Sequence, residues 1–417
     1  MHVADLLANS PHLPLIIYWG NSGTFDTDDS VKIVRLVLDN HRDRVRRITL
    51  HMSKLSLRKV LPSMNGTFPI LETLQLYCLS ENRPRTALPS MFEAPNLRHL
   101  QLSDLTIPPQ SSQLLSNVTT RPSIIIFSLG EITIKPATLI ECLASMPHLK
   151  VLKIGVLFVI PSERAERRER ALSKNQPESS SPLALTDLEE FEYQGISDYL
   201  EVIAARISAP FLKKLSITLS DTIHDSKNVD SSTFKYLSRL INGAAYLAFQ
   251  FARVRFKDGF SVVMDHDELW TGRGAFELKV NYHAGYRLDA NAGIGFVAKI
   301  CRVLVPMPST VQSLLLEDGD VDSWAQNPNR QGWLKLLGIF DNVKTLRVAG
   351  RFVEELDKAL KPDDGSKRSA VPKLLLKLEE IVLYGPESEF AAFVEARRVA
   401  GLPVRVVGGP KNRLMLY

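Results

Sequence analysis

A glycine-rich string in the second half of the chain has the spacing of a dinucleotide-binding turn. It runs from Gly293 to Ala298 (GIGFVA), and such a turn lets the backbone approach a pyrophosphate at the start of a helix. That chemistry requires a buried strand directly before the first glycine. Residues 287–292 (RLDANA) are polar and typical of a turn, and no strand–helix–strand pattern surrounds them. We therefore interpret the string as a loop that leads into a helix, and we expect no cofactor.

Acidic residues gather at two places where a cation could be held. Residues 265–268 (DHDE) are consecutive, but neighbouring residues of a strand point to opposite faces, so a metal would need a further ligand from elsewhere. Asp26, Asp28 and Asp29 resemble the beginning of a calcium loop, yet the glycine and closing glutamate of that loop are missing. We interpret the first group as a solvated loop. The second group, with Ser30, is expected to start a helix, whose free N–H groups it complements.

Residues for nucleophilic catalysis or metal binding do not occur in a recognisable pattern. The nine histidines show no H-x-x-x-H or H-E-x-x-H spacing, and neither G-x-S-x-G nor a P-loop is present. The three cysteines, Cys78, Cys142 and Cys301, are too few for a disulfide scaffold or an all-cysteine zinc site. Cys78 and Cys142 have apolar neighbours and are expected to be buried packing residues. No catalytic residue and no metal ligand is identified, and the chain is not expected to be an enzyme.

The elements that would position any binding residue are indicated by a repeated apolar spacing, L-x-x-L-x-L. It occurs in LETLQL at Leu71 and in LRHLQL at Leu97, which are 26 residues apart. A period in the twenties with this spacing is typical of leucine-rich repeats, in which L-x-L is a short parallel strand and the leading leucine enters the core. We identify ten copies, with apolar positions Val45, Ile48, Leu50; Leu71, Leu74, Leu76; Leu97, Leu100, Leu102; Ile124, Phe127, Leu129; Leu149, Leu152, Ile154; Leu188, Phe191, Tyr193; Leu212, Leu215, Ile217; Val311, Leu314, Leu316; Val343, Leu346, Val348; and Leu378, Ile381, Leu383.

The predicted fold class is therefore α/β, a leucine-rich-repeat solenoid or horseshoe over residues 1–417, with a parallel concave sheet and irregular convex helices. One repeat cannot bury its own apolar face, so each is stabilised by its neighbours. Amphipathic stretches such as 137–145 and 199–207 are the expected helices. Proline precedes several strands by a few residues, which suits a corner between helix and strand. The alternative is a doubly wound α/β domain, which would not repeat one string at nearly constant spacing.

The repeats are regular over residues 41–220, and two segments interrupt the period. Residues 161–182 contain the charge run ERAERRER followed by KNQPESSSP, and they are expected to form a flexible inserted loop. In residues 222–307 leucines become sparse, and the strings FQFARVRF and GAFELKVNY alternate apolar and polar residues. We interpret this segment as degenerate repeats, with a small inserted β unit as the alternative. Residues 308–417 are expected to form looser repeats.

The composition is that of an ordinary globular protein. A hydrophobic fraction of 45% with 23% charged residues excludes disorder and a fibre, and the net charge of +5 is too mild to predict a nucleic-acid or membrane partner. No apolar run is long enough to span a membrane. Asp5 and Asn9 interrupt the first hydrophobic stretch, which is not the order of a signal peptide. An intracellular location, cytoplasmic or nuclear, is expected.

Several strings resemble the F-box/leucine-rich-repeat proteins that are expanded in mushroom-forming fungi. They are LLANSPHLPLIIYW at 6–19, the H-x-x-R-V string at 41–45, FPILETLQL at 68–76, APNLRHLQL at 94–102 and FEYQGISDYLEVIAARISAP at 191–210. In that family the F-box docks the adaptor of a cullin ubiquitin ligase, and the repeats select the substrate protein. The F-box itself is not visible in this sequence. The resemblance therefore implies a Skp1-type adaptor as a partner only if an F-box lies upstream, and a ubiquitylation substrate as the target protein.

Strand alternation locates a candidate partner-binding surface. If Leu74 and Leu76 face the core, the residues that alternate with them point outward, and the same holds in the following repeat. The outward residues are Thr73, Gln75, Tyr77, His99, Gln101 and Ser103. The preceding repeat adds Arg47, Thr49 and His51 in register. These side chains can donate and accept hydrogen bonds and have no obvious partner in the row, whereas Lys153 beside Glu192 should form an ion pair.

The sequence thus predicts a protein-binding module that holds its target at this patch. Two other function classes stay open. One is a repeat protein that regulates an enzyme, similar to a GTPase activator, although such proteins have a more regular period. The other is an α/β enzyme with an unrecognised site.

Overall fold

The chain forms two compact units, residues 1–212 (unit 1) and 213–417 (unit 2), in a computed structural model. The structure describes residues 7, 9–10, 13–20, 27–78, 92–103, 124–132, 134, 136–156, 181–220, 240, 249–256, 259–266, 275–281, 288–303, 307–318, 324–326, 329–361, 374–384 and 390–409.

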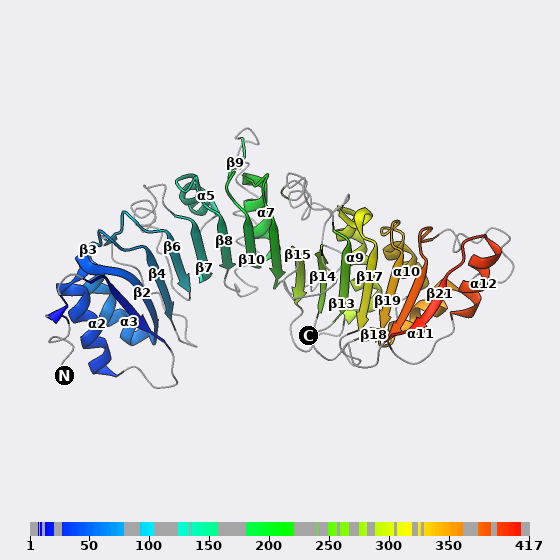
Figure 1. Cartoon of the computed structure of the whole chain (residues 1–417), viewed down its shortest axis with the longest axis horizontal. Helices are drawn as coiled ribbons and strands as arrows, with labels where there is room; N and C mark the ends of the chain where they lie inside the picture. The colour runs from blue at the N-terminus through cyan, green and yellow to red at the C-terminus, as the bar shows by residue number, and fades with distance from the viewer. Residues whose placement is uncertain are drawn as a thin grey trace. The chain divides into compact units, whose positions relative to one another are not determined.

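Unit 1 is built on a parallel sheet whose strands follow one another in chain order (Figure 1). The strands are β1 (Leu15–Trp19), β2 (Val45–Met52), β4 (Thr73–Cys78), β6 (His99–Ser103), β7 (Ile126–Ile132), β8 (Val151–Val156) and β10 (Glu190–Gly195). Two short parallel pairs join β3 (Gly66–Thr67) to β5 (Phe92–Glu93) and β9 (Leu183–Ala184) to β11 (Ile207–Ser208). Between strands lie α2 (Asp28–Asn40), η1 (Arg42–Arg44), α3 (Lys54–Val60), η2 (Leu61–Met64), α5 (Pro136–Ala144) and α7 (Ser197–Arg206).

The core consists of the apolar positions that the repeated spacing predicts. All thirty positions of the ten copies are at most 6% exposed, which confirms the predicted core. In β4, for example, Leu74 and Leu76 are fully buried, whereas Gln75 and Tyr77 between them are half-buried. Full burial of one leucine side chain stabilises the fold by about 1.5–3 kcal/mol relative to leaving it in water. The sheet therefore has a core face and a second face, called the outer face from here on.

A turn before each strand recurs at the predicted corners. The N–H of Leu71 donates to the carbonyl of Phe68 at 3.3 Å, so that Pro69 takes the second position of the turn. Proline suits that position because its ring fixes φ near the required value. The same bond, with proline in the same place, closes the turns at Leu97, Leu149 and Leu212.

One main-chain carbonyl accepts two hydrogen bonds from the next repeat and so links each repeat to the one before it. The carbonyl of Glu72 accepts hydrogen bonds from the N–H groups of both Arg98 and His99, at 2.9 and 3.0 Å. Because the same arrangement recurs from repeat to repeat, the amino ends of the strands are held in one register. The other carbonyls that accept two such bonds are those of Arg98, Ile125, Lys150, Gln250, Gln312 and Lys344.

Unit 2 also contains parallel strands, but their order departs from the chain order. The sheet runs β12-β15-β14-β13-β17-β19-β20-β21. These strands are β12 (Lys214–Leu219), β13 (Phe251–Phe256), β14 (Gly259–Asp265), β15 (Phe276–Asn281), β17 (Ser313–Asp318), β19 (Thr345–Ala349), β20 (Glu380–Tyr384) and β21 (Arg405–Gly408). A short pair joins β16 (Leu288–Asp289) to β18 (Trp324–Gln326), and the helices are α9 (Ala290–Val303), η4 (Met307–Thr310), α10 (Arg330–Leu337), α11 (Phe352–Leu360) and α12 (Ala391–Val399).

Strands β13, β14 and β15 form an antiparallel meander inside the otherwise parallel sheet. This antiparallel order differs from the parallel strands of unit 1, while degenerate repeats and an inserted β unit both stay predictions for residues 222–307. The physical reason for the antiparallel order is the short connection between Phe256 and Gly259, because a parallel pair needs a crossover of a dozen residues or more. Gly259 has a φ of +142°, and a Cβ there would clash with the carbonyl oxygen of Val280. Only glycine fits this corner.

The rest of the predicted segmentation remains a prediction. Residues 161–180 of the expected inserted loop lie outside the described residues, while Ser181 and Pro182 at its end are described. The described parts of both units give a mixed α/β fold with a large proportion of parallel strands.

Candidate partner-binding surface

The predicted site residues lie in three lateral rows on the outer face of unit 1, where Thr73 is buried and the other five are half-buried. Strand pairing places β2, β4 and β6 in the register that alternation predicts. The rows are Arg47, Thr73 and His99; Thr49, Gln75 and Gln101; and His51, Tyr77 and Ser103. All six predicted site residues are therefore brought together on two adjacent strands.

The middle row is a ladder of side-chain hydrogen bonds. The hydroxyl of Thr49 donates to Oε1 of Gln75 at 3.0 Å, and Nε2 of Gln75 donates to Oε1 of Gln101 at 3.2 Å. Parallel strands lie about 4.8 Å apart, so polar side chains in the same row reach one another directly. The expectation that these side chains lack partners in the row is corrected by this ladder. The ladder fixes the amide orientations and leaves the remaining polar atoms pointing in defined directions.

The third row contains a stacked aromatic pair. The rings of His51 and Tyr77 have centroids 4.0 Å apart and an interplanar angle of 13°. Tyr77 also forms a hydrogen bond with Gln101, while its partial burial raises the pKa of its hydroxyl. Next to Tyr77 in this row come Ser103 and then Gly130. A rigid aromatic pair beside small residues is an arrangement that can anchor a partner side chain at low entropic cost.

Strand β1 extends the same face with exposed apolar side chains that the sequence prediction did not include. Ile16 pairs with Arg47 and Tyr18 with Thr49, so both point outward. Ile16 is 65% exposed and Tyr18 is 71% exposed. Large apolar residues that stay exposed beside an ordered polar row are typical of an interaction surface. The alternation in LIIYW was the signal that could have identified them.

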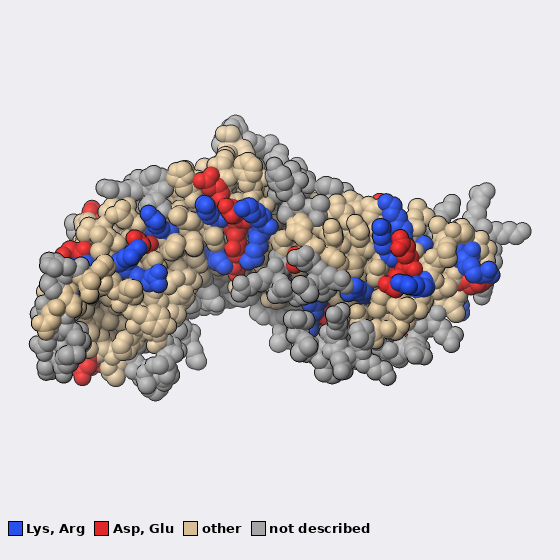
Figure 2. Space-filling view, viewed as in Figure 1, with Lys and Arg blue, Asp and Glu red and all other residues tan. Residues whose placement is uncertain are grey.

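Arginines surround the amino-terminal row. Arg46 forms an ion pair with Glu72 at 3.0 Å, and Arg47 and Arg98 lie close enough to act on the charge of His99. Figure 2 shows basic side chains beside an acidic one over the amino-terminal parts of β2, β4 and β6. Burial lowers the pKa of His99, and the charges of Arg47 and Arg98 lower it further. The ring is therefore neutral at pH 7.

The lowered pKa of His99 predicts a loss of stability in mild acid. The folded chain holds the ring neutral, whereas the unfolded chain protonates it near the ordinary pKa of 6.5. The stabilising contribution is therefore complete above pH 6.5 and is lost as the pH falls below that value. Unfolding in urea at pH values from about 7 to 5 should show a smaller loss for His99→Gln than for the native chain. An NMR titration midpoint of His99 at or above the ordinary value would contradict this.

Charged side chains over β8 and β10 neutralise one another. Nζ of Lys153 lies 2.8 Å from Glu192 and 3.5 Å from Glu190, and Figure 2 shows the acidic and basic groups side by side. This confirms the predicted Lys153–Glu192 pair. Burial alone would lower the pKa of Lys153, but the hydrogen bond with Glu192 and the two carboxylate charges raise it overall. We regard this cluster as structural.

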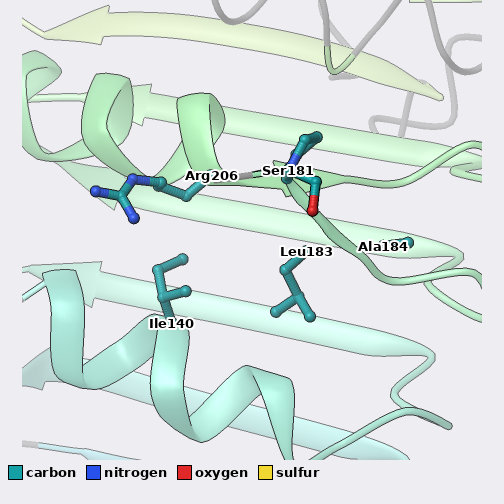
Figure 3. Close-up of a pocket in the computed structure, with 6 residues that line it drawn as sticks. Ile140, Ser181, Leu183, Ala184 and Arg206 are labelled. Carbon is teal, nitrogen blue, oxygen red and sulfur yellow. The ribbon is translucent and has the colours of Figure 1, made fainter. Parts of the chain in front are cut away.

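A hollow of roughly 400 Å³ lies between α5, α7 and the short strand β9. Two of its lining residues, Ser181 and Arg206, are polar, and in Figure 3 the guanidinium of Arg206 points away from Ser181. Polar groups that do not converge give no basis for a catalytic site. The lining residues are Ile140, Ser181, Pro182, Leu183, Ala184 and Arg206.

The structure also locates the glycine-rich string and the two acidic groups. Gly293 and Gly295 lie inside α9, three and five residues after its start at Ala290, so they do not form a phosphate-binding turn. The predicted helix is present as α2, but it begins earlier than expected, because its N-cap is Thr27 and Asp28, Asp29 and Ser30 lie within its first turn. Of residues 265–268 the structure describes two, and the Asp265 carboxylate accepts the N–H of His266.

The three cysteines are buried and not bonded to one another. Burial raises the pKa of Cys142 to about 12, with a contribution from Glu141, and burial also raises that of Cys301 to about 12. A thiol with such a pKa is protonated at neutral pH and is a poor nucleophile. In the described part of the chain, no three residues of the metal-ligating types are grouped to hold a metal ion. No helix among the described residues has the length and apolar character that a membrane crossing requires.

Comparisons with known proteins add little to this picture. The chain matches no protein-family model. It matches no curated protein sequence. Among solved structures, a similar one is the leucine-rich repeat-containing protein LegL7 from Legionella pneumophila, with 12% sequence identity, a TM-score of 0.26 and coverage of 89% of each chain. At this identity and TM-score the likeness adds nothing to what the strand register shows.

Proposed function

We propose that this chain is a leucine-rich-repeat solenoid that binds a protein target on the outer face of β1, β2, β4 and β6. The observation that carries the proposal is the combination of the His51–Tyr77 stack with the exposed Ile16 and Tyr18 on one face. Aromatic anchors that are already ordered lose little side-chain entropy on binding, and an adjacent apolar area adds to the buried surface. The hydrogen-bonded row between them supplies fixed polar contacts that orient a partner.

We extend the proposal to a non-catalytic role for the chain. Its support is the burial of the three cysteines and the absence, among the described residues, of a grouped set of metal-ligating side chains. The hollow beside α5 also lacks converging polar groups. A surface of hydrogen-bonded and stacked side chains suits recognition.

The finer part of the proposal concerns ubiquitylation. The F-box/leucine-rich-repeat family that the sequence resembles uses its repeats to select substrates for a cullin ubiquitin ligase. We propose that the target held on this face is such a substrate. Docking to a Skp1-type adaptor belongs to the F-box in that family and is not part of the role proposed for these repeats.

Truncating Tyr77 is expected to weaken target binding strongly while the fold is retained. Replacement of Tyr77 by alanine removes the stack on His51 and the hydrogen bond with Gln101. Loss of an aromatic anchor typically costs about 2 kcal/mol or more of binding free energy, so the affinity should fall at least about thirtyfold. The measurement is the dissociation constant of a target captured on the immobilised chain and then purified. His99→Ala and Tyr18→Ala should also weaken binding.

The matched control is Phe211→Ala. Phe211 is an exposed aromatic residue of unit 1 that lies outside the three rows. Its replacement should leave the affinity unchanged. Equal affinities of the native chain and Tyr77→Ala would refute the placement of the site. A large drop in melting temperature for Tyr77→Ala would show instead that the ring serves packing.

The ubiquitylation role has a separate test. Deleting the chain from its native cells should increase the abundance and half-life of the purified target, and inhibition of cullin ligases should have the same effect. An unchanged half-life in both experiments would rule out the ubiquitylation role and leave the binding role standing.

A further inference from the structure

Three cations meet two acids in two adjacent rows of the outer face of unit 2, where the meander meets β17, and a third acid of the meander, Asp265, lies at the end of β14, four residues beyond Ser261. Arg253 and Arg255 project from β13 and Lys279 from β15, while the acidic side chains are Glu277 on β15 and Glu317 on β17. The side chains of Arg253 and Glu317 are 15% and 9% exposed, so their charges are largely removed from water. A charge in such a position needs a partner of opposite sign.

Each acid has one close cation, and Glu317 has a second, more distant one. Oε2 of Glu317 lies 2.8 Å from Nε and 2.6 Å from a terminal nitrogen of Arg253, a close two-point contact. Nζ of Lys279 lies 2.6 Å from Glu277. Arg255 is different, because its Nε lies 3.6 Å from the same Glu317 oxygen and is buried without a hydrogen-bond partner. One guanidinium therefore has a charge that Glu317 does not neutralise fully.

Strand register creates a place for an anion beside Arg255. In the antiparallel meander Arg255 is opposite Ser261, and Ser261 is opposite Lys279. Strand spacing places Arg255 and Lys279 about 10 Å apart on the two sides of Ser261. The serine is short and carries a hydroxyl donor, so an incoming anion can lie between Arg255 and Lys279, whose ammonium group has further N–H donors besides the one that faces Glu277. The side chain of Arg255 is 32% exposed and that of Lys279 is 46% exposed, so both can be reached from solvent.

We propose that Arg255, Ser261 and Lys279 bind the carboxylate side chains of an acidic segment of a partner protein. An extended peptide can lie along a sheet face, and the planar guanidinium fork matches a carboxylate in geometry as well as in charge. Arg253 and Glu317 would position Arg255 without touching the peptide. This surface belongs to unit 2 and is independent of the binding site proposed on unit 1.

The experiment uses the full chain and a short, fluorescently labelled glutamate-rich peptide. Anisotropy should show binding that weakens with rising salt, and a glutamine-rich peptide of equal length should bind far less well. Arg255→Gln should weaken binding of the glutamate peptide at least about tenfold, because it removes a charge-assisted hydrogen bond. Ser261→Asp should abolish binding, because it places the chain's own carboxylate between the two cations.

The matched control is Lys299→Gln, which removes the same charge from an exposed position of α9 in the same unit. It should leave the affinity within about twofold, since distant exposed charges are screened at moderate salt. Equal losses for Lys299→Gln and Arg255→Gln would overturn the proposal, as would equal affinity for the two peptides. Thermal melting of every variant identifies any loss of fold. If Arg255→Gln does not fold, Lys279→Gln supplies the same test at the other side of Ser261.

Discussion

Replacement of Arg397 by methionine is expected to lower the free energy of unfolding of unit 2 by about 3–5 kcal/mol. Arg397 lies in α12 and is 1% exposed. Its guanidinium donates to main-chain carbonyls, at 2.9 Å for Leu374 and 3.1 Å for Leu402. Methionine fills much of the volume but leaves these acceptors without donors. The other carbonyls that it bonds are those of Leu375, Leu376 and Leu378.

The neighbouring arginine supplies the control for this prediction. Arg398 is exposed and pairs with Glu395, also on the surface, at 2.7 Å. Urea unfolding of Arg398→Met should closely follow that of the native chain, because exposed ion pairs are screened and contribute little. Similar unfolding midpoints for Arg397→Met and the native chain would show that solvent or local rearrangement satisfies the carbonyls.

The second large effect is expected from Glu317→Gln. The substitution keeps the shape but removes the carboxylate that faces Arg253 and Arg255 in a site with little exposure. Two guanidinium groups would then lie together without a compensating charge. Removing one partner of a buried ion pair typically lowers the free energy of unfolding by about 3–5 kcal/mol. Because Arg255 is partly exposed, we expect a loss near the lower end of that range. Chemical denaturation of unit 2 measures it.

A double-mutant cycle separates the charge effect from packing. Arg253→Met added to Glu317→Gln should restore part of the lost stability, since it removes one of the unpaired charges. Strictly additive losses in the double mutant would argue against an electrostatic cause. Glu317→Gln should also increase the affinity for the glutamate-rich peptide, because Arg255 loses its competing internal acid.

The repeated spacing predicts the core and the strand register because both follow from local periodicity. Leu71, Leu74 and Leu76 must enter one core, and neighbouring copies align only if the same positions pair. The outer row of Gln75 and Gln101 follows from the same alternation. Alternation does not predict how the outward side chains interact. The ladder from Thr49 to Gln101 depends on the side-chain rotamers of residues on three neighbouring strands.

The meander could not be deduced from apolar alternation, since parallel and antiparallel strands share a period of two. A signal was nevertheless present in Asp258-Gly259 between two alternating strings, a pair of residues typical of a hairpin. Arg397 had no such signal. It lies in a helical string with a second arginine beside it, and only the folded chain shows which of the two is buried.

The reversed strand order has a consequence for synthesis on the ribosome. Strand β12 ends at Leu219, but its neighbour in unit 2 is β15, which begins at Phe276. As the nascent chain emerges, β13 and β14 can form a hairpin at once, yet that edge of β12 stays unpaired until β15 has been made. Unit 1 can grow by adding each strand to the previous one, whereas unit 2 requires a non-local pairing before its parallel strands can continue. Vectorial folding should therefore pause here, and β12 is the segment most exposed to mispairing during the pause.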